Sequence, residues 1–320
     1  MSIKGRLVCC TLILLGPLLV LGISCKGEKR EAKDTNEREE TNEPETGIEK
    51  EALLAIRKAH GQIVRDLTVP ENPVVSIDLS GRRATDALLK HLVQFKSLRK
   101  LSLNLTNITD NGLRELQPIS SLRKLDLGYV DTITDEGLAH LAELKELENL
   151  SLVYTKVTDK GMKHVGKLTK LKVLYLTSVP IDGSGLEELG SLQSLQELFL
   201  SDTKVPDREL KHLNRLKELK LLWLAGTPIK GEGLKELHKL QQLDDLNLAF
   251  TKVTDVTLEN LKGMPSLRRL SVAGTAVTDR GLVHLKGMTK LESLHFAETV
   301  ITDTGIKNLK ENLPKLNAYR

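Results

Sequence analysis

A pattern of apolar positions returns every 24 residues from Val74 to the C-terminus. In each unit the apolar residues stand at positions 1, 4, 6, 11, 16, 19 and 22, and one extra residue near Val130 to Thr132 is the only slip before the last unit. A fixed period of this length is typical of a solenoid, whose units bury their apolar faces against one another. Position 1 of units 1 to 10 is held by Val74, Leu98, Leu122, Leu147, Leu171, Leu195, Leu219, Leu243, Leu267 and Leu291.

Two periodicities alternate inside each unit. Positions 1 to 6 read Leu-x-x-Leu-x-Leu, as in residues 147–152, and this alternation predicts a short β-strand. A Thr-Asp pair then precedes apolar residues three apart, as in residues 158–165. That second pattern predicts a short helix whose free N–H groups are capped by the Thr and Asp side chains. Each unit should therefore run strand, turn, helix and return loop.

The motif Leu-x-x-Leu-x-Leu-x-x-Thr-x-Val/Ile-Thr-Asp-x-Gly-Leu-x-x-Leu resembles the leucine-rich repeat, in particular the ribonuclease-inhibitor-like and related bacterial types. The resemblance covers Val74 to Arg320. It implies an α/β solenoid shaped as a curved horseshoe, with a parallel β-sheet on the concave face and short helices on the convex face. At position 9 the chain has Thr where the family usually has Asn, and we expect these hydroxyl groups to bond turn backbone groups instead. They belong to Thr106, Thr155, Thr203, Thr227, Thr251, Thr275 and Thr299.

Three segments precede the ten repeats of residues 74–320. Residues 1–25 place Lys4 and Arg6 before an apolar run, which is typical of a secretory signal peptide. Residues 26–47 are almost entirely charged or small and polar, so we expect a disordered linker. Residues 48–73 show a helical pattern and then an extended one. We interpret them as an N-terminal cap, a helix plus a strand, that covers the edge of the first repeat strand.

Residues 21–25, Leu-Gly-Ile-Ser-Cys, are similar to the lipobox of bacterial lipoproteins. The similarity implies lipidation of Cys25 and attachment of an exported chain to a cell-envelope membrane. The sequence departs from the lipobox at Gly22, where leucine is usual. Gly22 and Ser24 also suit ordinary signal cleavage, so free secretion and a retained anchor stay open as alternatives. All cysteines lie in the first 25 residues, and no disulfide or thiolate metal site is predicted in the repeats.

Two polar residue types recur in the repeats. Asp at position 13 stands at a helix start, where negative charge is stabilised, and we interpret it as a cap. His at position 18 lies between two core positions, so we expect it to face outward as helix surface. Neither set has the spacing of a metal site, and no cofactor-binding motif is present. The position 18 histidines are His91, His140, His164, His212 and His284.

Charge and polarity argue against two functional classes. The formal charge of +4 is spread without a Lys/Arg stripe, so we expect no nucleic-acid binding. His295 is the one histidine predicted on the concave face, near Ser271, Ser293 and Glu298. This group lacks an evident oxyanion hole, and we therefore expect the protein not to be an enzyme.

The repeats break their own pattern at position 5, which lies between two core positions of the strand and should face the concave surface. Three consecutive units place Tyr175, Phe199 and Trp223 there, in a chain with only 3% aromatic residues. Contiguous exposed rings mark binding sites. The alternative is that neighbouring rings only stabilise the sheet as cross-strand pairs.

We expect this stripe to bind a protein or peptide. Position 8 adds rings at the rim, and position 3 and the next unit extend the patch. The predicted binding residues beyond the three rings are Tyr154, Phe250, Leu221 and Asn247, with Tyr129 and Val173 nearby. A glycan is the alternative ligand, because rings stack on sugar faces and Thr177, Ser201 and Asp202 offer polar groups. Charges at positions 2 and 3 change along the face, from Arg99, Lys100, Arg123 and Lys124 to Glu148, Glu197, Asp244 and Asp245.

Overall fold

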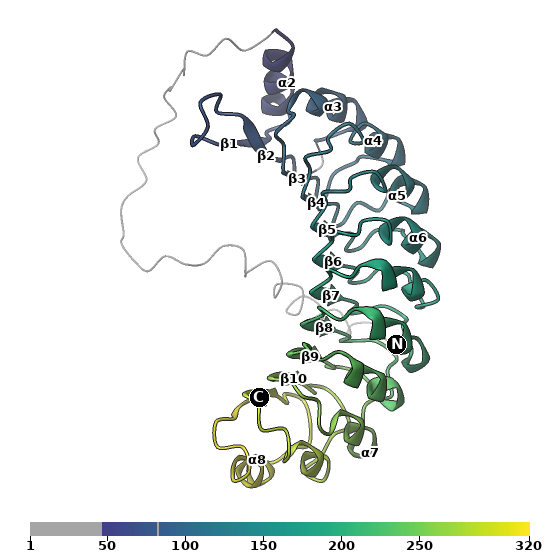
Figure 1. Cartoon of the computed structure of the whole chain (residues 1–320), viewed down its shortest axis with the longest axis vertical. Helices are drawn as coiled ribbons and strands as arrows, with labels where there is room; N and C mark the ends of the chain where they lie inside the picture. Colours follow the sequence, from purple (N-terminus) through teal and green to yellow (C-terminus); the bar gives the residue numbers. More distant parts are fainter. Residues whose placement is uncertain (1–46, 82) are drawn as a thin grey trace, which may run out of the picture. The chain divides into compact units, whose positions relative to one another are not determined.

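The computed structural model describes residues 47–81 and 83–320. The predictions for the signal peptide, for Cys25 and for nearly all of the linker fall outside these residues. The described part is built on a 12-stranded sheet whose strands follow one another in chain order (Figure 1). β1 (Gln62–Arg65) pairs antiparallel with β2 (Val74–Asp78), and all later neighbours pair in parallel.

The strands after β2 occupy positions 3 to 5 of their units. They are β3 (Lys100–Ser102), β4 (Lys124–Asp126), β5 (Asn149–Ser151), β6 (Val173–Tyr175), β7 (Glu197–Phe199), β8 (Leu221–Trp223), β9 (Asp245–Asn247), β10 (Arg269–Ser271), β11 (Ser293–His295) and β12 (Asn317–Tyr319). Each position pairs with the same position of the next unit, and Asp126 pairs with Ser151 across the extra residue. The inserted residue is therefore absorbed in the loop after β4, and the sheet register is kept.

The repeat helices lie on one side of the curved array and the strands lie on the other (Figure 1). The α-helices are α2 (Gly47–Lys58), α3 (Asp86–Leu89), α4 (Asp110–Arg114), α5 (Asp135–Leu141), α6 (Met162–Val165), α7 (Asp255–Leu258) and α8 (Asp303–Lys310). The 3₁₀ helices are η2 (Lys90–Gln94), η3 (Asp159–Gly161), η4 (Leu186–Ser191), η5 (Asp207–Arg215), η6 (Glu232–Lys239), η7 (Glu259–Leu261) and η8 (Gly281–Leu285). The predicted α/β solenoid is confirmed, although units 5 to 7 and unit 9 carry only the tighter 3₁₀ form.

The core follows the apolar positions of the repeat. In unit 5 all seven are fully buried: Leu171, Leu174, Leu176, Ile181, Leu186, Leu189 and Leu192. Leucine and isoleucine side chains of neighbouring units form one continuous cluster, which Ala52, Leu53 and Ile56 of α2 join at the N-terminal end. No described helix is long and apolar enough to cross a membrane.

The threonines at position 9 bond backbone groups as predicted. The Thr155 hydroxyl donates a hydrogen bond of 2.8 Å to the carbonyl oxygen of Leu152, and Thr203 does the same to Leu200 at 2.7 Å. The same contact recurs at Thr106, Thr227, Thr251, Thr275 and Thr299. The carbonyl oxygen of Leu152 also accepts a 3.1 Å hydrogen bond from the Thr155 backbone N–H, so the hydroxyl adds a second donor to the turn.

Asp at position 13 joins neighbouring units, and the prediction that it caps its own helix is wrong. The Asp135 carboxylate accepts hydrogen bonds from the backbone N–H and the hydroxyl of Thr158, at 2.7 and 2.6 Å. In four units Thr at position 12 supplies the N-cap instead. Thr134 accepts from the Glu136 N–H, and Thr158, Thr254 and Thr302 accept in the same way from their own helices. Equivalent contacts join Asp86 to Thr109, Asp110 to Thr134, Asp255 to Thr278 and Asp279 to Thr302.

Glycine at position 15 makes room for that carboxylate. A Cβ atom on Gly161 would lie 2.5 Å from Asp135 Oδ1, which is too close for any side chain. Where position 13 is itself glycine, the next unit has a larger residue at position 15. Gly183 is followed by Glu209, and Gly231 by Thr257. The recurring aspartates and glycines are therefore complementary parts of one contact between units.

Candidate functional site: the concave ring cluster

Strands β6, β7 and β8 bring the three predicted rings together. Tyr175 pairs in register with Phe199, and Phe199 with Trp223. The rings of Tyr175 and Phe199 stack, with centroids 4.4 Å apart and planes 14° apart. Trp223 meets Phe199 nearly at a right angle, with centroids 5.0 Å apart. We call Tyr175, Phe199 and Trp223 the ring cluster.

The ring cluster is less exposed than a row of free rings would be. Phe199 is only 4% exposed, whereas Tyr175 and Trp223 are half-buried. The stack covers one face of Tyr175, and Phe199 lies between its two neighbours. Phe199 therefore supports the outer rings, and Tyr175 and Trp223 provide the surface that a ligand can reach.

The neighbours of the ring cluster are mostly apolar. Val173 and Leu221 are half-buried at position 3. Position 7 of units 7 to 9 carries a row of buried small residues, Ala225, Ala249 and Ala273. Asn247 lies beside Trp223 in register, and its side-chain oxygen accepts a 2.9 Å hydrogen bond from the Ala249 N–H. Part of its polar capacity is thus used by its own turn.

The rim residues at position 8 all have left-handed backbone conformations. The φ angles are +60° at Tyr129, +55° at Tyr154 and +56° at Phe250. Other units place glycine there, at Gly81, Gly226 and Gly274. This conformation costs an L-residue roughly 1–2 kcal/mol, so backbone preference does not explain the rings. The glycine that recurs at position 8 was the sequence signal for this left-handed conformation.

The rim rings pack locally. Tyr129 and Tyr154 stack with centroids 4.9 Å apart and planes 17° apart. The Phe250 ring lies over Gly274, where an added Cβ atom would come within 2.4 Å of the ring. Tyr154 and Phe250 remain exposed. These residues flank the ring cluster on either side along the array.

Several polar groups near the ring cluster have no hydrogen-bond partner in the described part of the chain. They are the indole Nε1 of Trp223 and the hydroxyl of Ser201, both buried. Burial raises the pKa of Tyr175, and the neighbouring Glu197 and Asp126 raise it further. Burial also raises the pKa of Glu197, with a smaller contribution from Asp245.

The predicted charge change along the concave face is partly neutralised by ion pairs. Glu148 pairs with Lys172 at 2.8 Å and with Arg123 at 3.7 Å, and the Lys172 hydrogen bond lowers the pKa of Glu148. Arg269 pairs with Asp245 at 2.6 Å and also with Asp244. The acidic residues of units 4 and 8 are therefore compensated within the chain.

The other candidates do not assemble into sites. Ser271 and His295 are register neighbours, but the buried Ser271 hydroxyl has no hydrogen-bond partner among the described residues. The histidines at position 18 are half-buried on the helices, and burial lowers the pKa of His164. Within residues 47–81 and 83–320 no group of three His, Cys, Asp or Glu side chains is placed to hold a metal ion.

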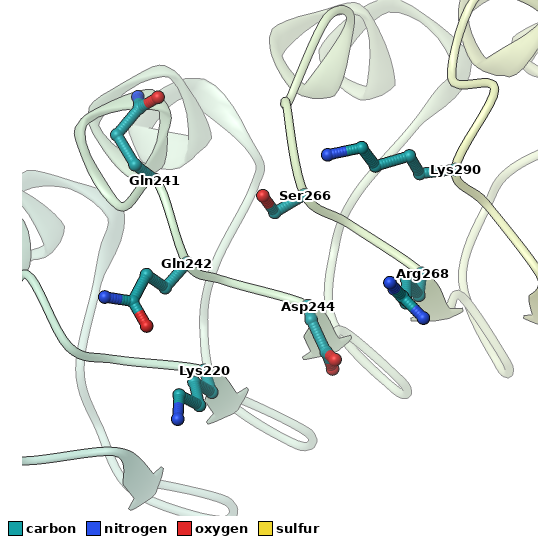
Figure 2. A pocket seen from close by; sticks show the side chains of 7 residues that line it. All are labelled: Lys220, Gln241, Gln242, Asp244, Ser266, Arg268 and Lys290. Carbon is teal, nitrogen blue, oxygen red and sulfur yellow. The ribbon is translucent and has the colours of Figure 1, made fainter.

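A shallow hollow of about 270 Å³ lies among the loops that lead into β8 to β11. Its lining is polar and comes from Lys220, Gln241, Gln242, Asp244, Ser266, Arg268 and Lys290 (Figure 2). Asp244 is held by Arg269, and Arg268 lies 3.6 Å from Glu292. In Figure 2 Gln241 points away from the other labelled side chains. The hollow lacks the convergent groups of a ligand site.

A family model described as a leucine-rich repeat region matches residues 78–318. The chain belongs to the leucine-rich repeat family. No curated protein matches this leucine-rich repeat chain. Among solved structures, an internalin from Listeria monocytogenes is 19% identical, with a TM-score of 0.47 over 84% of this chain and 93% of its own.

Two plant receptors share more of the backbone geometry. The ectodomain of the receptor kinase GASSHO1/SCHENGEN3 from Arabidopsis thaliana, in complex with CASPARIAN STRIP INTEGRITY FACTOR 2, has a TM-score of 0.55 and 20% identity. The match covers 78% of this chain and 30% of that one. The plant peptide hormone receptor RGFR1 in complex with RGF2 has a TM-score of 0.52 and 19% identity, over 78% and 39%. At these identities the likeness shows the fold alone.

Proposed function

We propose that this leucine-rich repeat protein binds a protein or peptide on its concave face, with the ring cluster as the central anchor. The observation that carries the proposal is the in-register contact of Tyr175, Phe199 and Trp223. Large aromatic side chains in the centre of a patch, supported from below, are the residue types that dominate binding energy at interfaces. Leu221 and Val173 extend this patch on one side.

The indole N–H of Trp223 adds a second argument. It is buried and lacks a partner in the described part of the chain. A buried donor without an acceptor costs about 1–3 kcal/mol, and a ligand carbonyl oxygen would recover that cost once a shift of the indole brings the N–H to the surface. The site therefore favours a ligand with both apolar side chains and backbone carbonyl groups, which describes a polypeptide.

The comparisons support this class of function by analogy. The two plant receptors above share the fold and are in complex with RGF2 and with CASPARIAN STRIP INTEGRITY FACTOR 2. Fold alone does not fix function, so the weight rests on the ring cluster. We propose a binding role without catalysis, because the described residues place no convergent nucleophile and base beside the cluster.

A glycan is the second candidate ligand. The unpartnered Ser201 hydroxyl, with Thr177 and Asn247 nearby, offers groups for sugar hydroxyls. Sugar stacking needs open ring faces, however, and Phe199 is buried in the stack. Trp223 is left as the main platform. This geometry favours a peptide over a glycan.

The test is a selection of random 12-residue displayed peptides on the full chain and on Trp223→Ala. We expect Trp223→Ala to recover selected clones at least 10-fold less well, since hot-spot truncations cost about 2 kcal/mol or more. Val283→Ala, an exposed apolar residue on η8, serves as the control and should retain binding. Tyr175→Ala is included as a second variant of the ring cluster, and a glycan array is probed with the same four proteins. If Trp223→Ala and Tyr175→Ala both leave all binding unchanged, the proposal fails.

We further propose that the protein is an exported bacterial lipoprotein anchored through Cys25. The support is the lipobox-like sequence of residues 21–25 behind an apolar run. Mass spectrometry of the mature N-terminus should find a lipid-modified Cys25 in the membrane fraction, and Cys25→Ala should release the protein from it. An unmodified N-terminus at another residue would contradict the anchor and favour free secretion.

A further inference from the structure

Glu197 is an acidic residue in an apolar part of the concave face. It stands at position 3 of β7, and its register neighbours are Val173 on one side and Leu221 on the other. No ion pair or hydrogen bond from the described residues reaches its carboxylate. A charge in such surroundings is costly unless an opposite charge meets it.

Asp202 is the second unpaired carboxylate of the same unit. It lies at position 8 with a φ of +56°, and its Oδ1 leans over Gly226, where an added Cβ atom would be 2.2 Å away. Asp202 is exposed to solvent, and desolvation by the surrounding turn still raises its pKa. Within residues 47–81 and 83–320 no cation accompanies it. Unit 6 therefore carries two uncompensated carboxylates, one on each side of Phe199.

In neighbouring units the acidic side chains of the concave face have partners within the chain. Glu148 in unit 4 is held by Lys172, and Asp245 in unit 8 is held by Arg269. Asp126 in unit 3 accepts a hydrogen bond from the Gly128 N–H. The described chain thus compensates the acids around the ring cluster but leaves Glu197 and Asp202 free.

Ser201 is an independent sign that unit 6 is incomplete without a ligand. Its side chain is 6% exposed, and its hydroxyl has no hydrogen-bond partner in the described structure. Position 7 alternates onto the same face as Phe199 and Glu197. A hydroxyl can donate or accept, so once the side chain rotates toward the concave surface a peptide group or a cationic side chain would satisfy it.

We propose that the concave site takes a polypeptide segment with a cationic side chain, arginine or lysine, that pairs with Glu197 while an apolar side chain packs on Trp223. This inference rests on the proposed function. A guanidinium group can bond a carboxylate through two N–H groups and stack on the adjacent Tyr175 ring. Asp202 would hold a second cation. Glu197 and Asp202 are five residues apart in one unit, so their Cα atoms are at most about 18 Å apart, which a short peptide segment can span.

The experiment uses the displayed 12-residue peptides on the full chain, Glu197→Gln, Trp223→Ala and Glu187→Gln. Glu187 is an exposed carboxylate in η4 and serves as the matched control. Peptides selected on the full chain should be enriched at least 3-fold in Arg plus Lys over the unselected library. Glu197→Gln should still select peptides, but without that enrichment. Glu187→Gln should behave like the unchanged chain.

Affinities of one selected peptide then separate the two proposals. Replacement of its Arg or Lys by norleucine should weaken binding about 10-fold to the unchanged chain and less than 2-fold to Glu197→Gln. Trp223-dependent binding without basic enrichment, or equal losses on both proteins, would overturn this inference and leave the proposed function standing. Recovery of no peptide above background, or recovery independent of Trp223, would overturn both. Thermal unfolding of each variant shows that it is folded.

Discussion

Polar groups in the turns before the repeat helices have hydrogen-bond partners within the chain, whereas some on the concave face of this solenoid do not. At the turns, the Asp135 carboxylate is matched by two donors of Thr158 and by the space at Gly161, and the contact recurs along the array. On the concave face, Glu197 and the Ser201 hydroxyl lack partners in the described chain. The chain satisfies the polar groups of these turns. We infer that Glu197 and Ser201 face a ligand.

The strongest test of the turn contact is Gly161→Ala. The new Cβ atom would lie 2.5 Å from Asp135 Oδ1 and 2.9 Å from Leu138 Cδ1, so we expect a loss of about 2–3 kcal/mol in the free energy of unfolding, measured in urea. Adding Asp135→Gly imitates the natural Gly231 and Thr257 pair and should recover part of that loss. Purely additive losses would contradict the complementary contact.

A second test asks whether Asp at position 13 stabilises the contact between neighbouring units or caps its own helix. Asp135→Ala should lower the free energy of unfolding by about 2 kcal/mol, because both Thr158 donors lose their acceptor. Asp303 is the matched control. It starts helix α8 at the same repeat position, but the described residues hold no helix of a following unit for it to contact, and it is exposed beside Arg320 at 3.2 Å. Asp303→Ala should cost less than about 0.5 kcal/mol. Equal losses would favour capping.

The 24-residue period was enough to predict the architecture. Because every core position, such as Leu174 or Ile181, recurs at the same place in each unit, strand register and the alignment of Tyr175 with Phe199 follow from stacking alone. The link from Asp135 to Thr158 was missed because it joins different units. It becomes visible only when position 13 of one unit is read against positions 12 and 15 of the next.

The details of the candidate site were harder to predict. Period 2 places Phe199 on the concave face, but its burial depends on how neighbouring rings stack, which alternation does not specify. Whether Glu197 and Ser201 have partners depends on which long side chains reach them. The left-handed turn at position 8 had a signal in Gly226 and Gly274, but the rings in other units masked it.

Substitutions at position 8, on the rim of the concave face, are expected to change stability less than those in the turns. Leu105 has a φ of +58° and is exposed, so Leu105→Asn should stabilise the protein by about 1 kcal/mol, because asparagine tolerates the left-handed region better. Phe250→Asn at the same position should gain less, since it also removes the ring packed on Gly274. Urea unfolding of both variants measures the difference. A larger gain at Phe250 would mean that its ring contributes nothing to the fold.

The smallest expected effect concerns pH. The pKa of Glu197 is raised, so its contribution to stability is present below its unfolded pKa and is lost as the pH rises through the folded pKa. Glu197→Gln should therefore be more stable than the unchanged chain at pH 7, by about 0.5 kcal/mol, with the difference shrinking toward pH 4. The pKa of Glu148 is lowered, so Glu148→Gln should be less stable at pH 7. Thermal unfolding at both pH values checks the opposite signs.

The most direct measurement uses the single tryptophan of the chain, Trp223, as the reporter. A peptide selected on the full chain is titrated while acrylamide quenching of Trp223 emission is followed, and calorimetry gives the affinity independently. The account predicts that quenching falls in a saturable way with the calorimetric midpoint, because the peptide covers the indole. Full calorimetric binding with unchanged quenching of Trp223 would contradict it.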